Sequence, residues 1–297
     1  MKDKKIIITS SDSKYFHLVK ELYNSVKNHN LHNYFDFGIL DTGLLKNQLE
    51  ELRSENVIIK STEWNIKVPS YKVRGRDHLK NIVARAFLPD YFTGYTKYIW
   101  LDADTWINHK ETFMLYDRGC ENNKICITPQ VDRSYGELAK VEWFLNFPKR
   151  IKTINYKNIS RSISKSFAKK FAMLPTLNGG AFSINNNFKI WKQFQKNIEL
   201  ALQKGRIFGS DQVALAISIY EDNIPAEFLP AYTNYMCEFH YPFYDQNNSL
   251  FVEPFLPHNP IGVMHLAGLD IIRKKEGVLV KIKNLQGGEL NKSLRFN

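Results

Sequence analysis

Short apolar runs alternate with segments of helical periodicity through the N-terminal third of the chain, and this alternation leaves few folds open. The apolar runs are rich in β-branched or aromatic residues and predict buried strands at residues 5–9, 35–40, 57–59 and 97–101. Apolar side chains at helical spacing predict helices at residues 15–27, 44–52 and 78–92, with Pro89 a point at which the last could end early. The alternation predicts an α/β fold with a mostly parallel sheet, flanked by helices and joined by right-handed crossovers.

The second half of the chain follows a less regular pattern. It predicts a strand at residues 177–184 and helices at residues 188–203 and 211–220. Residues 224–260 are rich in proline and aromatic side chains, and we interpret them as an irregular segment with short strands, packed on the main sheet. Most of these aromatics are expected to pack in the fold, and a minority could line a sugar site. We expect a single domain over residues 1–270, followed by a basic tail over residues 271–297.

The composition is that of a globular protein, with 43% hydrophobic and 24% charged residues among 297, which excludes disordered and fibrous classes. The apolar stretches fall far short of the roughly 20 residues that a bilayer span needs. A signal peptide is not expected, because polar residues follow the apolar residues 6–8 at once. Cys120, Cys126 and Cys237 lack metal-finger spacing and indicate neither a disulfide framework nor a zinc module. We therefore expect a reduced, cytoplasmic protein.

The net charge of +11 suggests an anionic partner such as a nucleotide, an anionic lipid surface or a nucleic acid. Part of the excess is concentrated, because residues 143–198 contain no Asp or Glu. The basic residues of this stretch are Lys149, Arg150, Lys152, Lys157, Arg161, Lys165, Lys169 and Lys170. A second basic cluster occupies residues 273–275. A solvated basic face without a partner would explain the same pattern.

Two carboxylates follow the predicted buried strand at residues 97–101. Asp102 and Asp104 are separated by Ala103, and in extended backbone such residues project from the same face. Open α/β sheets bind ligands at this end of their strands. Two close carboxylates repel each other unless a proton or a cation intervenes, and Mn²⁺ or Mg²⁺ accepts such oxygen ligands. The pattern predicts a metal site; a turn whose acids cap a helix is the alternative.

A third ligand is suggested far downstream. His265 lies in a largely apolar run, residues 261–268, shortly before Gly268. A neutral imidazole would complete a site of two oxygens and one nitrogen suited to Mn²⁺. Taken alone, His265 would more often be an ordinary buried histidine, so this hypothesis depends on the two aspartates.

The ordered set of motifs resembles the retaining glycosyltransferases of family 8, which have the GT-A fold, over about residues 5–270. Residues 7–12 with Tyr15 resemble the family's nucleotide-binding first loop, and residues 101–104 its metal motif. The remaining matches are its second strand end at residues 40–43, the helix with a donor-contacting arginine at 84–88, the Asn-Ala-Gly strand at 177–182, the Asp-Gln-Asp segment at 211–212 and the metal histidine at 265–268.

The resemblance implies a UDP-linked sugar donor and a Mn²⁺ or Mg²⁺ ion held by Asp102, Asp104 and His265. It implies roles in sugar transfer for two residues: Asp211 would bind a sugar hydroxyl, and Gln212 would stabilise the oxocarbenium-like centre. The other implied donor contacts are Thr9, Ser10, Asp12 and Tyr15 at uridine, Arg85, Ala103 and Gly268 elsewhere on the donor, and Asn178, Gly179, Gly180 and Asp132 at the sugar.

Two departures from the family pattern are visible. Val213 stands where the third residue of Asp-Gln-Asp would be acidic. The lysine that often follows the histidine and grips the diphosphate is absent from its usual offset, and Arg273, Lys274 or Lys275 would have to replace it.

The sequence thus predicts a metal-dependent glycosyltransferase that moves a hexose from a UDP-sugar, with retention, onto a glycan resembling a lipooligosaccharide or polysaccharide, or onto a lipid-linked acceptor. The basic stretch and tail could dock it on an anionic membrane, at the inner face. One alternative keeps the fold with DNA or protein as acceptor, although nucleic acid is disfavoured. Another is a non-catalytic module that binds nucleotide or glycan. A nucleotidyltransferase is disfavoured, because residues 9–12 lack a glycine-rich basic loop.

Overall fold

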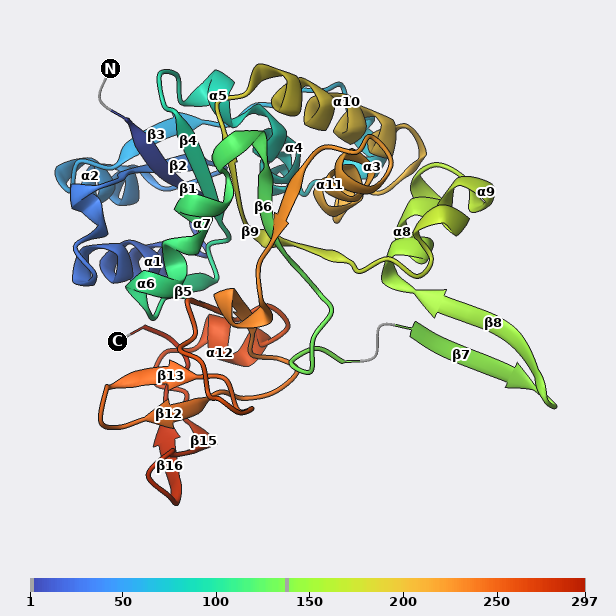
Figure 1. Ribbon diagram of the computed structural model, residues 1–297. Helices are drawn as coiled ribbons and strands as arrows, with labels where there is room; N and C mark the ends of the chain where they lie inside the picture. Colours follow the sequence, from blue (N-terminus) through green and yellow to red (C-terminus); the bar gives the residue numbers. More distant parts are fainter. Residues whose placement is uncertain (1–2, 137–138, 297) are drawn as a thin grey trace.

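A central sheet of seven strands organises the computed structural model, which describes residues 3–136 and 139–296 (Figure 1). Its order is β10-β6-β9-β4-β1-β2-β3. The strands are β1 (Lys5–Ser11), β2 (Asp36–Asp41), β3 (Ile58–Ser61), β4 (Lys97–Leu101), β6 (Ile125–Pro129), β9 (Leu177–Asn185) and β10 (Ala226–Phe228). Strand β9 runs antiparallel to its neighbours β4 and β6, whereas the other neighbouring strands pair in parallel. The prediction of a mostly parallel sheet is confirmed.

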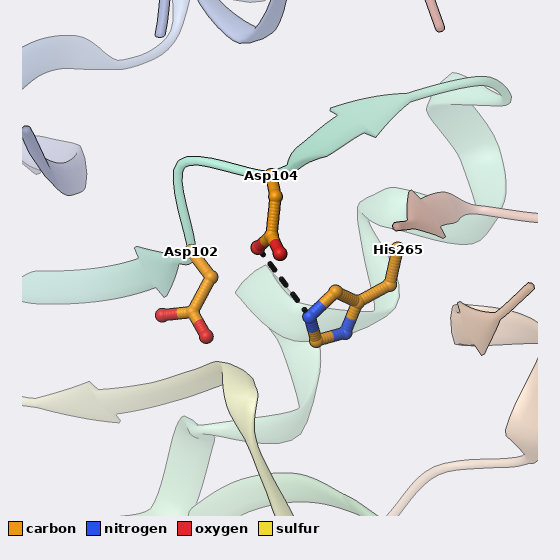
Figure 2. A group of neighbouring side chains, drawn as sticks. All are labelled: Asp102, Asp104 and His265. Carbon is orange, nitrogen blue, oxygen red and sulfur yellow. Dashed lines mark ion pairs between the residues drawn. The ribbon is translucent and has the colours of Figure 1, made fainter. Parts of the chain in front are cut away.

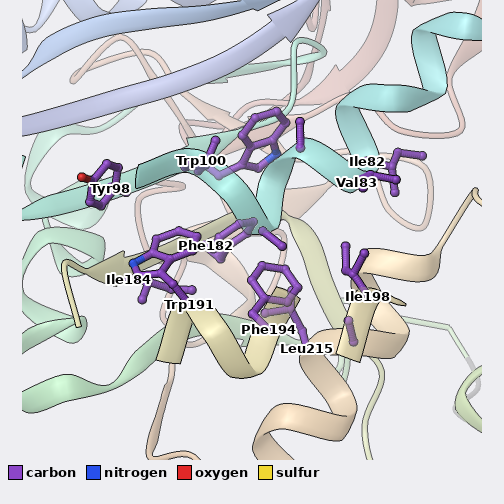
Figure 3. Close-up of a cluster of buried hydrophobic side chains, with 14 of the residues drawn as sticks. Ile82, Val83, Tyr98, Trp100, Phe182, Ile184, Trp191, Phe194, Ile198 and Leu215 are labelled. Carbon is purple, nitrogen blue, oxygen red and sulfur yellow. The ribbon is translucent and has the colours of Figure 1, made fainter. Parts of the chain in front are cut away.

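Helices cover both faces of this sheet, because alternate residues of the central strands point to opposite sides. Tyr98 and Trp100 of β4 face one buried cluster, which Phe194 and Leu215 complete from the helical side (Figure 3). The helices of this face are α4 (Lys80–Ala84), α5 (Leu88–Tyr91), α10 (Phe188–Lys204) and α11 (Ser210–Tyr220). The opposite face packs against α1 (Phe16–Asn28), α6 (Lys110–Phe113) and α7 (Leu115–Gly119). The short helices α2 (Lys46–Ser54) and α3 (Ser70–Val73) lie in the N-terminal half.

The segment predicted as one helix at residues 78–92 is broken in the structure. A 3-10 turn (Asp77–Leu79) precedes α4, and a second one (Arg85–Phe87) separates α4 from α5. Arg85 and Ala86 are buried at this break. Pro89 lies in the first turn of α5, where the absence of its N–H costs nothing. The break therefore follows from burial of a charged residue against the sheet, and the proline begins a helix instead of ending one.

Three smaller sheets lie beside the main one. The first has the order β11 (Asn234–Met236), β14 (Val263–His265), β5 (Thr105–Ile107). The others are the hairpins β12 (Phe243–Asp245)–β13 (Leu250–Val252) and β15 (Val280–Lys283)–β16 (Glu289–Lys292). Residues 271–297, expected as a basic tail, contribute most of α12 (Asp270–Lys274) and the β15–β16 hairpin, and bury Ile272, Ile282 and Leu294 in a core that they share with the β11–β14–β5 sheet.

A two-stranded hairpin of β7 (Ala139–Phe144) and β8 (Phe147–Thr153) projects away from the body of the molecule (Figure 1). Helices α8 (Ile154–Ser162) and α9 (Lys165–Ala168) follow it and pack on α10 and α11 through a small apolar cluster. Within the described residues, no helix has the length and apolar character that a membrane crossing requires.

Candidate active site

Asp102 and Asp104 lie in a tight turn that joins β4 to β5. The backbone N–H of Thr105 donates to the carbonyl oxygen of Asp102 over 3.1 Å, and the Thr105 hydroxyl donates to the same oxygen over 2.7 Å. The expectation that extended backbone aligns the two carboxylates is wrong, because β4 ends at Leu101. The turn closed by Thr105 brings the carboxylates together instead.

His265 reaches the same place through strand pairing. It ends β14, which runs antiparallel to β5 with His265 opposite Thr105. Asp102, Asp104 and His265 each offer one ligand atom, and these three atoms lie within 4.8 Å of one another. Figure 2 shows the three side chains gathered at one place. The His265 Nε2 is 3.6 Å from the Asp104 Oδ1. The structure therefore unites three residues separated by more than half of the chain, as predicted.

The orientation of the His265 ring is fixed by Asn234 on the neighbouring strand β11. The ring Nδ1 lies 3.0 Å from the Asn234 Oδ1. An amide oxygen only accepts, so Nδ1 carries the hydrogen and Nε2 presents its lone pair toward the carboxylates. Two carboxylates and a neutral imidazole Nε2, converging from three directions, form a donor set that fits Mn²⁺ or Mg²⁺.

Arg85 ties Asp102 to Asp211 at the bottom of the site. Its Nη2 lies 2.7 Å from the Asp102 Oδ1, and its Nη1 lies 2.6 Å from the Asp211 Oδ2. The Trp100 indole N–H also donates to the Asp102 Oδ1 over 2.9 Å, and the guanidinium lies 4.6 Å from the Trp100 ring centroid. These partners occupy one oxygen of Asp102 and leave Oδ2 free to bind a cation.

Asp211 lies in the first turn of α11 beside Gln212 and is buried, with 3% of its surface exposed. Burial raises the pKa of its carboxyl above the ordinary value, the Arg85 cation opposes this shift, and the nearby Asp102 adds to it. The paired Arg85 cation is the main compensation for a buried charge at this position.

Two glycines of β9 let its backbone pass directly beneath the cluster. A Cβ atom at Gly180 would lie 2.2 Å from the His265 Cε1 and 3.1 Å from the Asp102 Oδ2. One at Gly179 would lie 3.2 Å from the Asp211 Oδ2. Any larger residue at position 180 would therefore displace His265 and Asp102.

Asn178, which precedes these glycines, accepts a hydrogen bond from the Gly180 N–H through its Oδ1 over 3.1 Å. Its Nδ2 is buried and has no hydrogen-bond partner among the described residues. Thr9, near the end of β1, also has a buried hydroxyl without a partner there. Both atoms therefore have capacity for a further hydrogen bond.

The other candidates for uridine binding surround the carboxyl end of β1, which lies beside β4 with Ile8 opposite Trp100. Ser10 accepts a hydrogen bond from Asn81 over 2.8 Å. The Asp12 Oδ1 accepts from the backbone N–H groups of Lys14 and Tyr15 over 3.0 and 3.2 Å, which holds the loop in shape. These side chains reach the same edge of the sheet as the cluster.

The remaining candidates for donor binding are Gly268, Ala103 and Asp132. Gly268 has a φ of +79°, and a Cβ atom there would lie 1.3 Å from the Glu238 Oε2, so the backbone requires glycine. Ala103 sits in the turn between the two aspartates. Asp132 is exposed in the loop after β6, where its Oδ1 accepts from the Ser134 N–H over 3.0 Å. No contact among the described residues joins Asp132 to Asp102, Asp104 or His265.

The comparisons with known proteins agree with this geometry. The model of the family described as Glycosyl transferase family 8 matches residues 6–173, more than half of the chain. The chain belongs to glycosyl transferase family 8. A crystal structure of an active-site mutant of LgtC superposes with a TM-score of 0.53 at 15% identity, covering 88% of this chain and 87% of that one. The GT-A-type fold expected from the sequence is confirmed.

The bifunctional glycosyltransferase WbbM superposes with a TM-score of 0.50 at 15% identity and 79% coverage of this chain, which spans 40% of the length of WbbM. A search of curated protein sequences found no match.

One residue of this family 8 chain gains a specific place only from the structure. Arg273 of α12 was one of three basic residues considered for the diphosphate. Its Nη1 lies 2.9 Å from the Asp104 Oδ2, its Nη2 pairs with Asp270, and its guanidinium lies 5.9 Å from the Tyr15 ring centroid. Lys274 instead pairs with Asp270 at the surface. Arg273 and Lys274 are adjacent in the sequence, and only the structure of α12 shows which of them reaches Asp104.

Asn234 was missed by sequence reasoning altogether. It lies 31 residues before His265 in the chain, in a segment interpreted as irregular. Its contact arises from the parallel pairing of β11 with β14, in which Asn234 lies opposite Val263. A short polar residue in such a segment carries no signal that would single it out.

Proposed function

We propose that this family 8 protein is a metal-dependent glycosyltransferase that moves a hexose from a UDP-sugar, with retention of configuration, onto a glycan acceptor. The observation that supports it most is the convergence of Asp102, Asp104 and His265 at the sheet edge where β1 presents Thr9 and Asp12. A metal and a nucleotide held at one edge are what donor activation requires.

The cation, Mn²⁺ or Mg²⁺, would be held by the Asp104 carboxylate, the free oxygen of Asp102 and the Nε2 of His265. When bound, it would stabilise the charge that develops on the leaving nucleoside diphosphate. Arg85 and Asn234 hold the ligand side chains in place before the cation arrives. This preorganisation lowers the cost of assembling the site.

Arg273 is the residue that we assign to the diphosphate. Its guanidinium already reaches the metal cluster through Asp104, and its planar donors match phosphate oxygens in pairs. It would take the place of the lysine that the family pattern leads one to expect. Arg273 can keep Asp104 in place without a donor and contact the phosphates when a donor is bound.

At the sugar end, the unpartnered Nδ2 of Asn178 would donate to a sugar hydroxyl. Asp211 is fixed by Arg85, which suits a carboxylate that orients a hydroxyl better than one that attacks carbon. Gln212, the next residue, would stabilise the oxocarbenium-like centre, and a front-face route then accounts for retention. Asp132 would contact the sugar only if its loop turned inward.

A thermal-stability experiment tests this proposal on the full chain. UDP-glucose, UDP-galactose and UDP, each with and without Mn²⁺, are added to the protein and to the Asp104→Asn and Asp132→Asn variants. Ligand at about 100 times its dissociation constant adds roughly 2.7 kcal/mol, which raises the melting temperature by several degrees. We expect a rise that needs both UDP and Mn²⁺ and that is lost in Asp104→Asn. With UDP itself the rise should be kept in Asp132→Asn, because Asp132 would contact only the sugar.

A second experiment tests retention. The protein is incubated with the UDP-sugar that stabilises it most, and NMR follows the anomeric configuration of the sugar that slow hydrolysis of this donor releases. No rise with any UDP compound would overturn the donor assignment, and an inverted product would overturn the proposed stereochemistry.

A further inference from the structure

The end of the β7–β8 hairpin carries a cluster of exposed apolar side chains, which we call the apolar tip. It consists of Trp143, Phe144, Leu145 and Phe147, with exposed fractions of 63%, 62%, 81% and 73%. The hairpin stands clear of the body of the molecule (Figure 1), so packing in the fold does not explain these residues. Contiguous apolar groups of this kind on a surface mark an interaction site.

The backbone at the tip supports this interpretation independently. Leu145 has a φ of +52°, in the left-handed region that bulky side chains disfavour. Glycine, asparagine or aspartate would suit a hairpin turn better at this position. A leucine that strains the turn and yet is the most exposed residue of the tip is therefore not there to stabilise the hairpin.

A basic surface extends along β8 to the end of the hairpin opposite the tip, where α8 and α9 follow (Figure 1). Lys149 on β8 and the residues of α8 and α9 that follow contribute exposed cations, and residues 143–198 contain no acid. These exposed cations, which we call the basic patch, are Lys149, Lys157, Arg161, Lys165 and Lys169. Lys170, also exposed, pairs with Glu221 from α11.

We propose that the apolar tip inserts into the interfacial region of a bilayer that contains anionic lipids, while the basic patch contacts the headgroups. Tryptophan and phenylalanine favour the membrane interface, and lysines near an anionic surface add attraction. A second copy of this chain fits the tip less well, because pairing two tips would also bring together two basic patches on molecules of net charge +11. The proposal does not depend on the proposed transfer reaction.

The place of the hairpin in the fold gives this docking a direction. It follows β6, and β6 and β4 both run antiparallel to β9, so their carboxyl ends share one edge of the sheet. Asp102 follows β4 at that same edge. A bilayer contacted by the hairpin would therefore lie on the side of the molecule where the metal cluster is.

Vesicle flotation of the full chain tests the proposal, with vesicles of phosphatidylcholine alone or mixed with phosphatidylglycerol. We expect binding to the mixed vesicles only, and a decrease in binding as salt is added. Leu145→Gly and Trp143→Ser should each lower the partition coefficient by about tenfold. Lys157→Gln and Lys165→Gln should each lower it by about fivefold, the equivalent of the attraction of one lysine to an anionic surface.

Two controls separate docking from folding. Phe188→Ser removes an exposed phenylalanine at the start of α10 and should bind as the wild type does. Leu145→Gly relieves the disfavoured turn, so its melting temperature should equal or exceed that of the wild type while its binding falls.

Tip variants that bind vesicles as the wild type does would overturn the proposal. So would a wild-type dimer that the tip variants convert to monomers, with no vesicle binding by either, since the tip would then cover a second copy.

Discussion

Gly180 lies where β9 passes beneath the three candidate metal ligands, and it is the residue whose replacement should damage the site most directly. In Gly180→Ala the new methyl would lie 2.2 Å from the His265 Cε1, so the imidazole must move. We expect metal affinity to fall at least about tenfold and the free energy of unfolding to fall by about 1–3 kcal/mol, the usual cost of overpacking. Calorimetric titration with Mn²⁺ and urea unfolding measure the two effects.

Gly136→Ala is the matched control for this substitution. Its nearest neighbour would be the Phe239 Cδ1 at 3.5 Å, which is an ordinary contact. It should leave both Mn²⁺ binding and stability unchanged. Equal Mn²⁺ affinity in Gly180→Ala and Gly136→Ala would contradict the assignment of His265 and Asp102 as ligands.

His29, just after α1, should make stability depend on pH. Its Nε2 lies 3.1 Å from the Ile107 carbonyl oxygen, and burial lowers its pKa below 6.5, with His109 and Lys110 acting in the same direction and Glu111 against it. A lowered folded pKa means that the unfolded chain binds the proton more tightly. The stability that neutral His29 contributes is therefore complete above about pH 6.5 and is lost as the pH falls through the folded pKa.

Comparison with His29→Gln isolates this contribution, since glutamine can donate to the same carbonyl but does not titrate. Urea unfolding at about pH 7.5 and about pH 5 should show the wild type losing stability relative to His29→Gln at the lower pH. His32→Gln, at an exposed histidine, should follow the wild type at both values. A difference between wild type and His29→Gln that is the same at both pH values would show that His29 does not titrate in this way.

At the level of elements, the sequence predicts best where a long pattern decides the structure. The β4 strand was predicted at residues 97–101 and is Lys97–Leu101, and α10 was predicted at residues 188–203 and is Phe188–Lys204. Apolar residues of both elements lie in the same buried cluster on one face of the main sheet, so the local pattern and the tertiary packing agree. The two aspartates could be predicted for the same reason, because they follow β4, whereas His265 was suggested only by its apolar run together with the aspartates.

Elements fixed by tertiary contacts could not be predicted in this way. The break between α4 and α5 exists because Arg85 turns inward to Asp102 and Asp211, and these partners lie far away in the sequence. The turn that holds Asp104 depends on Thr105, and Asn234 meets His265 only when β11 and β14 pair. The β7–β8 hairpin lacked an assignment from the sequence, although residues 139–143 alternate between apolar and polar side chains, because its turn contains leucine in place of glycine.

At the scale of the whole molecule, the C-terminal residues pack against α1 and β5 and so support the site. The Trp106 indole of β5 donates to the Leu294 carbonyl over 2.8 Å, and β5 pairs with the strand that carries His265. The C-terminal residues therefore pack against the same small sheet that positions His265. Loss of these contacts should destabilise the whole fold and not only its last residues.

Arg295 provides the test of that coupling, because it joins the C-terminal end to α1. It is buried, its Nε lies 2.9 and 3.1 Å from the two carboxylate oxygens of Glu21, and its Nη2 also pairs with Glu21. Arg295→Met leaves Glu21 largely buried without its cation, which should lower the free energy of unfolding by about 3–5 kcal/mol.

The exposed pair of Lys281 and Glu289 in the β15–β16 hairpin is the matched control, 2.5 Å apart. Lys281→Met should cost about 0–1 kcal/mol, because solvent screens the charges and the pair gains little. Urea unfolding followed by tryptophan fluorescence measures both variants. We expect one cooperative transition, shifted to lower urea in Arg295→Met, since Trp106 reports from the sheet that the C-terminal residues cover. An early separate phase in Arg295→Met, with the main transition unshifted, would mean that the C-terminal segment unfolds on its own and does not support the site.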